Sequence, residues 1–101
     1  MRIIVMFDLP TESVEDLRNY RFFRKYLMSH GFIMMQESIY TKLALNPTSA
    51  DIAKKQVRKV VPKNGLIQML TITEKQFQSM ELLSGSNKSQ YLDSDKRYIK
   101  L

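Results

Sequence analysis

The chain has 101 residues, of which 44% are hydrophobic and none is cysteine. This length fits one folded domain, and the absence of cysteine excludes disulfides, thiolate metal sites and a cysteine nucleophile. Sixteen lysines and arginines against ten acids give a formal net charge of +6, which favours a polyanionic partner, either nucleic acid or an anionic membrane surface.

No apolar run approaches the roughly 20 residues of a membrane-spanning helix, and the first ten residues lack the pattern of a secretory signal. We therefore expect a cytoplasmic protein. Because a domain this small buries a modest share of its surface, dimerisation would supplement its core.

The first half of the chain predicts a strand, a helix and two further strands. Residues 2–8 are almost continuously apolar, as expected of a central strand covered on both faces. Residues 11–29 predict a helix that Thr11 or Ser13 caps and that stops at Gly31. Its apolar positions step by three and four, which predicts one buried stripe of Leu17, Tyr20, Phe23 and Leu27. Residues 32–45 read as two strands with a break at 36–38.

The second half predicts a helix, a strand and a tail. Asn46 and Pro47 open the helix, with Thr48 or Ser49 as alternative caps, and Pro62 ends it. A turn at 63–65 precedes a strand at 66–73. Residues 73–77 then predict a turn or short helix, and residues 79–83 an extra strand.

The order β-α-β-β-α-β indicates the α+β class, as a ferredoxin-like domain over residues 1–83 with an extra C-terminal strand. Residues 84–101 predict a polar linker and a tail. Because the tail has no core of its own, we expect it to pack on its own domain or on a partner's, as an exchanged strand.

Asp8 is the candidate metal-binding and catalytic residue, because it ends an apolar strand at the end where ligands often bind in α/β sheets. Burial of a carboxylate is costly unless it is hydrogen-bonded, protonated or bound to a cation. The alternative is a structural carboxylate that stabilises the turn before the helix. One carboxylate is too few for tight Mg²⁺ binding. A second Asp8, from a partner chain across a two-fold axis, would complete a site for Mg²⁺ or Mn²⁺ against a phosphodiester.

Basic residues form a stripe on the first predicted helix. Arg18, Arg21 and Lys25 lie at i, i+3 and i+7, a spacing that suits a phosphate backbone read without sequence preference. An ordinary solvated face is the alternative. Arg24 lies close to the apolar stripe instead, which predicts a buried or interface ion pair.

Three other basic features are weaker candidates. Lys42, on a strand, could reach a nucleic acid that lies across the sheet edge. His30 precedes Gly31, where helix capping is the preferred interpretation. A second basic group, more typical of a solvated face, runs along the second predicted helix: Lys54, Lys55, Arg58, Lys59 and Lys63.

Three segments carry a resemblance to a known family: IIVMFDLPT at 3–11, YRFFRKYLMSHGFIMMQESIYTKLALN at 20–46 and GLIQMLTITEKQF at 65–77. Their order and spacing resemble the small CRISPR-associated spacer-acquisition protein, the second universal adaptation subunit, an endoribonuclease-like family. The match is strongest to the branch found with single-effector, type II systems, and it covers residues 1 to 83.

The resemblance implies a homodimer that forms through its sheets and exchanges C-terminal strands. It implies a scaffold that binds double-stranded DNA and bridges dimers of the larger CRISPR integrase subunit during spacer acquisition. The alternative is a Mg²⁺-dependent endonuclease that cleaves RNA or DNA, because the metal position of the family corresponds to Asp8. The basic surface of the family corresponds loosely to Arg18, Arg21 and Lys25. Outside the family, a ferredoxin-like domain that binds a small metabolite is disfavoured by the basic charge and by the lack of a glycine-rich loop.

Overall fold

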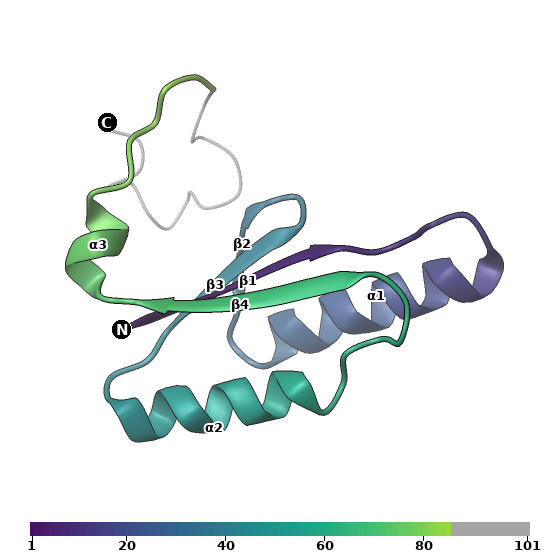
Figure 1. Cartoon of the computed structure of the whole chain (residues 1–101), viewed down its shortest axis with the longest axis horizontal. Coiled ribbons are helices and arrows are strands. Elements are labelled where there is room, and N and C mark those ends of the chain that lie inside the picture. Colours follow the sequence, from purple (N-terminus) through teal and green to yellow (C-terminus); the bar gives the residue numbers. More distant parts are fainter. Residues whose placement is uncertain (86–101) are drawn as a thin grey trace.

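The computed structural model describes residues 1–85. Their elements follow in the order β1 (Arg2–Asp8), α1 (Val14–Ser29), β2 (Ile33–Gln36), β3 (Ile39–Leu43), α2 (Pro47–Arg58), β4 (Leu66–Ile72) and α3 (Glu74–Gln78). The strands form one antiparallel sheet in the order β2-β3-β1-β4, and α1 and α2 lie on the same side of it (Figure 1). The predicted α+β class and its β-α-β-β-α-β order are therefore confirmed.

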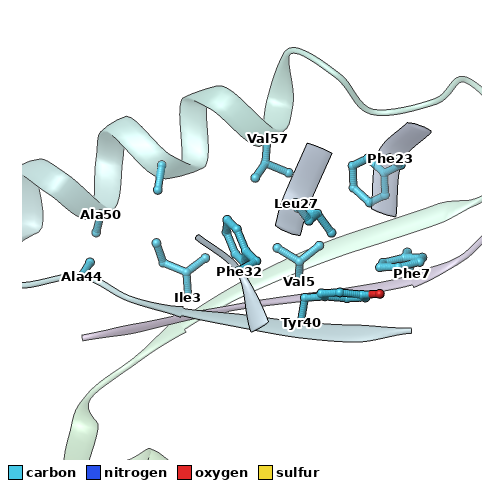
Figure 2. Close-up of a cluster of buried hydrophobic side chains, with 11 residues drawn as sticks. Ile3, Val5, Phe7, Phe23, Leu27, Phe32, Tyr40, Ala44, Ala50 and Val57 are labelled. Carbon is cyan, nitrogen blue, oxygen red and sulfur yellow. The ribbon is translucent and has the colours of Figure 1, made fainter. Parts of the chain in front are cut away.

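Side chains alternate along β1 and so divide between two faces of the sheet. Ile3, Val5 and Phe7 point towards α1 and α2 and pack with Phe23 and Leu27 in the core (Figure 2). The other face is not covered by α1 or α2, and we call it the open face. Directly paired residues share a face, so the register assigns to the open face Arg2, Ile4, Met6, Asp8, Ile33, Ile39, Thr41, Leu43, Leu66, Gln68, Leu70 and Ile72.

The ends of α1 follow the sequence closely. Ser13 Oγ accepts a hydrogen bond from the Asp16 amide at 3.0 Å, and Asp16 Oδ2 accepts one from the Ser13 amide at 3.2 Å. Of the two predicted caps, Ser13 is therefore the right one. The helix ends with His30 as its C-cap, and Gly31 follows with a φ of 90°, which glycine adopts without strain.

The predicted start of α2 at Asn46 and Pro47 is confirmed, but two details were wrong. The cap is Asn46 and not Thr48 or Ser49, because Pro47 occupies the first helical position and Asn46 Oδ1 accepts a hydrogen bond from the Ser49 amide at 2.8 Å. The helix also ends at Arg58 instead of reaching Pro62. A residue that precedes proline avoids the helical region, and the chain uncoils before it through a tight Val60 N–H to Val57 carbonyl bond of 3.0 Å.

The extra strand predicted at residues 79–83 was also wrong. The short helix predicted before it is present as α3, and Ser79 caps its C-terminus through bonds back to the carbonyls of Lys75 and Gln76. Residues 80–83 then continue without pairing to any strand in the described range. The predicted tail lies beyond residue 85 and so outside the described residues. The boundary of the domain at residue 83 stays a prediction.

A clamp between the first strand and α3 holds the end of the fold. Arg2 Nε donates to Glu74 Oε2 at 2.6 Å, and the guanidinium carbon lies 4.2 Å from the centroid of the Phe77 ring. Arg2 and Phe77 are both buried. α3 is thereby fixed beside the start of β1, so it covers one end of the open face and leaves the other end uncovered.

Candidate metal-binding and nucleic-acid-binding sites

Asp8 lies at the uncovered end of the open face. It pairs with Leu66, the first residue of β4, and follows Phe7, whose ring is buried against Phe23 at a centroid distance of 5.2 Å. Because Phe7 points into the core, the alternation of the strand directs the Asp8 carboxylate to the open face. The side chain is exposed.

The Asp8 carboxylate forms no hydrogen bond or ion pair with any other residue in the range 1–85. The role of capping the helix belongs to Ser13, so the structural alternative considered for Asp8 lacks a contact to support it. Carboxylate oxygen is the donor type that Mg²⁺ prefers.

One copy of the chain offers an incomplete metal site. Within residues 1–85 no three His, Asp or Glu side chains come together in a group that could hold an ion. Mg²⁺ commonly takes one or two carboxylates and keeps several waters. Asp8 therefore fits the predicted ion as one ligand per copy, and a second copy would have to supply the other carboxylate.

Gly65 fixes the backbone on which Asp8 sits. Its φ is 102°, and a Cβ at this position would lie 2.9 Å from the Asp8 carbonyl oxygen and 2.6 Å from Leu9 Cδ2. Only glycine permits both the left-handed conformation and the close approach. The turn before β4 thus presses directly on the end of β1 and sets the position of its last residue.

The open face is strongly apolar over its whole length. Ile33, Leu43, Leu66 and Leu70 are each about half exposed on it, although they belong to a regular sheet. Of the eight side chains that β1 and β4 place on this face, Arg2, Asp8 and Gln68 are polar and the other five are apolar. A monomer rarely exposes a contiguous apolar sheet surface, which marks an interaction site.

The basic stripe of α1 lies on the other side of the molecule. Phe23 and Leu27 pack α1 onto the sheet, whereas Arg18, Arg21 and Lys25 are exposed on the side of the helix that faces away from it. None of the three makes an ion pair or hydrogen bond within the described range. The structure thus keeps these three predicted residues together and leaves them available, but separates them from Asp8.

Lys42 does not join that stripe. It pairs with Ile3 and so lies on the helix side of the sheet, where its Nζ donates to the His30 carbonyl oxygen at 2.6 Å. A cation is favoured at this position because the C-terminus of α1 carries partial negative charge. The predicted ion pair of Arg24 is absent from the described residues; its Nε donates to the Tyr40 hydroxyl at 2.7 Å instead.

Two pKa shifts accompany these contacts. Burial raises the pKa of the Tyr40 hydroxyl above its ordinary 10.0, and the hydrogen bond from Arg24 opposes this effect. The hydrogen bond from Arg2 holds the pKa of the Glu74 carboxyl below its ordinary 4.5. Both groups belong to structural contacts and lie apart from Asp8.

The sequence prediction missed a row of rings on α1. The Phe22 and Tyr26 centroids are 6.2 Å apart, and the Tyr26 and His30 centroids are 3.9 Å apart. The i, i+4, i+8 spacing of these residues was visible in the sequence as a signal for one helix face. We call these three residues the ring ladder.

Comparison with known proteins places the chain among CRISPR-associated proteins. A family model described as CRISPR associated protein Cas2 matches residues 1–80. The chain is 48% identical over 101 residues to a protein named CRISPR-associated endoribonuclease Cas2 from Treponema denticola, with 100% of both chains covered. It is 45% identical over 99 residues to a protein of the same name from Streptococcus mutans, and this match covers 98% of this chain and 91% of that one.

A solved structure shares the fold. The crystal structure of Streptococcus pyogenes Cas2 at pH 6.5 superposes with a TM-score of 0.63 over 83% of this chain and 100% of that chain. The sequence identity is 19%, so this likeness carries the fold alone. In the described part of the chain, none of the helices is long and apolar enough to cross a bilayer.

Proposed function

The chain belongs to the Cas2 family of CRISPR-associated proteins, and on that premise we propose that it is a spacer-acquisition subunit. It acts as a homodimer that binds double-stranded DNA and bridges dimers of the larger CRISPR integrase subunit. The observation that carries this proposal is the half-exposed apolar sheet surface of the open face. Such a surface fits a second copy of itself packed sheet to sheet.

A dimer through the open faces would be isologous, with the same residues contributed by both copies. It would bury the exposed leucines at positions 66 and 70 and bring the two Asp8 residues to the same interface. α1 would stay outside, because it covers the opposite face of each sheet. The stripe of Arg18, Arg21 and Lys25 therefore remains free in the dimer, and its three unpaired cations suit a phosphate backbone.

Charge reversal tests the DNA-binding stripe. Replacement of Arg18, Arg21 and Lys25 together by glutamate should abolish measurable duplex binding at physiological salt. A milder variant with three alanines should lower the slope of log affinity against log salt by about three, one unit for each phosphate contact. Fluorescence anisotropy with a labelled duplex over a salt series measures both effects.

The matched control is a triple glutamate variant on α2. Lys55, Arg58 and Lys59 are likewise exposed, and each reversal removes two units of charge, so either triple variant lowers the formal net charge from +6 to zero. If the α2 variant loses duplex affinity as strongly as the α1 variant, net charge alone is responsible and the assignment of the stripe fails. Undiminished binding by the α1 variant contradicts it as well.

A metal-dependent endonuclease is the second candidate, and the unpartnered Asp8 carboxylate on the open face favours it. The names of the T. denticola and S. mutans relatives contain endoribonuclease. In the proposed dimer, Asp8 from each copy would hold Mg²⁺ or Mn²⁺ against a phosphodiester. A bound divalent ion would supply Lewis-acid activation and a water of lowered pKa. Gly65 would keep the two carboxylates in place through its contact with the Asp8 backbone.

The isosteric variant Asp8→Asn should abolish Mg²⁺-dependent cleavage of a labelled RNA and leave duplex binding unchanged. Glu12→Gln is the control, because Glu12 is an exposed carboxylate close to Asp8 in the chain but outside the sheet. Cleavage that persists in purified Asp8→Asn protein would rule out Asp8 as the metal ligand. That result would not affect the scaffold proposal, which needs no cleavage.

A further inference from the structure

The ring ladder of α1 is held in a fixed geometry. The Tyr26 and His30 rings are nearly parallel, with an interplanar angle of 17°, and the Phe22 ring is tilted by 39° against Tyr26. His30 Nδ1 lies 2.9 Å from the Tyr26 carbonyl oxygen, to which it donates. Lys42 holds the His30 carbonyl from the sheet side. His30, at the C-terminal end of the ladder, is therefore held in place, and Phe22 forms the N-terminal end.

Phe22 is not a core residue. Its side chain is 56% exposed, whereas the adjacent Phe23 is fully buried. By the 3.6-residue period of the helix, the ladder lies between the buried stripe and the basic stripe. An exposed phenylalanine beside a stacked pair of rings contributes little to the fold, so its position calls for a contact outside the chain.

Cations flank the exposed ring. Arg18 and Lys25 lie four residues before and three residues after Phe22, so each is its neighbour on the helix surface. Both are exposed and form no ion pair in the described part of the chain. The acids of α1 are confined to its first turn, at Glu15 and Asp16. The ring thus sits in a positively charged surrounding.

From these contacts we infer that the ring ladder is a stacking platform for the unpaired bases of a single-stranded nucleic acid. Phe22 receives a base on its open side, and Arg18 and Lys25 hold the flanking phosphates. Aromatic rings beside a basic track are the general means of binding single strands, because every base has a stacking face. The bases of a duplex are already stacked on one another, so the ladder discriminates against duplex, whereas the cations do not.

This inference goes beyond the proposed scaffold, which requires cations but no exposed ring. The two surfaces share Arg18 and Lys25, so variants of the ring separate them. The full chain is tested by fluorescence anisotropy with a labelled oligothymidylate of about 20 nucleotides and with a duplex of the same length. Thymidine is chosen because it forms no competing secondary structure.

Phe22→Ala should weaken oligothymidylate binding roughly 5- to 150-fold, the range for loss of one stacking ring, and leave duplex binding unchanged. Met28→Ala is the matched control: Met28 is an apolar residue of the same helix, 44% exposed, on the far side of the basic stripe. It should change neither affinity. Thermal unfolding of both variants shows whether the fold is intact.

Phe22→Trp adds a fluorescence signal that should change on binding only if a base stacks on the ring, and not if the ring has a purely structural role. The chain contains no tryptophan, so the new indole is the only one. It should restore the affinity for oligothymidylate, and its fluorescence should be quenched on binding, because a base stacks on it. Absence of quenching at saturation overturns the inference.

The affinities of the wild type and of Phe22→Ala for the two nucleic acids also test the inference. Wild-type affinity in Phe22→Ala overturns the inference and assigns the ladder to a protein contact, and equal loss of single-strand and duplex affinity overturns it too. If the wild type holds oligothymidylate through Phe22 but does not bind duplex, the scaffold proposal fails and the stacking platform stands. If the wild type binds duplex but not oligothymidylate, the stacking platform fails and the scaffold proposal stands.

Discussion

Leu70→Ala should weaken the proposed dimer without unfolding the subunit. Leu70 lies on the open face opposite Ile4 of β1 and is 50% exposed in the single chain. Complete burial of a leucine contributes about 1.5–3 kcal/mol, so about half of that remains to be gained when a partner covers it. A two-fold interface contains the residue twice. The expected loss is therefore about 1.5–3 kcal/mol in dimerisation free energy, or roughly 10- to 150-fold in Kd.

Sedimentation equilibrium over a dilution series measures this Kd. Ile52→Ala is the matched control, because Ile52 is 54% exposed but belongs to α2, on the other side of the sheet. The control should leave Kd unchanged. An equal effect of both variants, or none from Leu70→Ala, would refute the assignment of the open face as the dimer interface.

Three further predictions concern contacts that stabilise the fold. Tyr40→Phe removes the acceptor of the 2.7 Å hydrogen bond from Arg24, so the free energy of unfolding in urea should fall by about 1–2 kcal/mol. The control is Tyr20→Phe, because the Tyr20 hydroxyl makes no hydrogen bond within residues 1–85; it should change the free energy of unfolding by less than about 0.5 kcal/mol. Equal changes in both variants would contradict the role of the Tyr40 hydroxyl. Gly65→Ala should lower Tm by at least about 4–8 °C, because it adds backbone strain and a contact of 2.9 Å with the end of β1; an unchanged Tm would speak against the close approach. Because the folded pKa of Glu74 is lowered, its contact with Arg2 stabilises the protein fully above pH 4.5 and is lost as the pH falls through that lowered value. The acid-induced loss of Tm should therefore be smaller in Glu74→Gln, and identical pH profiles would exclude the clamp.

The order of the elements was predictable because each pattern is local. The apolar run of β1, the three-and-four spacing on α1 and the glycine at position 31 each act within a few residues. The errors arose where two local preferences compete. Asn46 and Ser49 are both good caps, and the position of Pro47 decides between them. Residues 79–83 are apolar enough for a strand, but a strand requires a pairing partner that the sequence does not identify.

The site was predictable in position but not in surroundings. Asp8 was identified as the end of a strand, yet its lack of partners depends on Ser13 as the cap and on the register with Leu66. Lys42 shows the same limit: its pairing with Ile3 turns the side chain towards the helices, away from the expected sheet edge. The exposure of Phe22 depends on how α1 is rotated against the sheet, which a periodicity of 3.6 residues alone leaves open.

Asp8 and Phe22 lie on opposite sides of the subunit, so variants can separate the two proposed activities. Cleavage would need two copies, because one open face supplies a single Asp8 and no group of three potential metal ligands comes together within residues 1–85. Stacking on Phe22 would need one copy, because the ring and its flanking cations belong to one helix. Leu70→Ala at concentrations below its dimer Kd should therefore lose Mg²⁺-dependent cleavage and keep its affinity for oligothymidylate. A monomer that lost both activities together would mean that the ring ladder depends on the dimer, against its position on the outer side of α1.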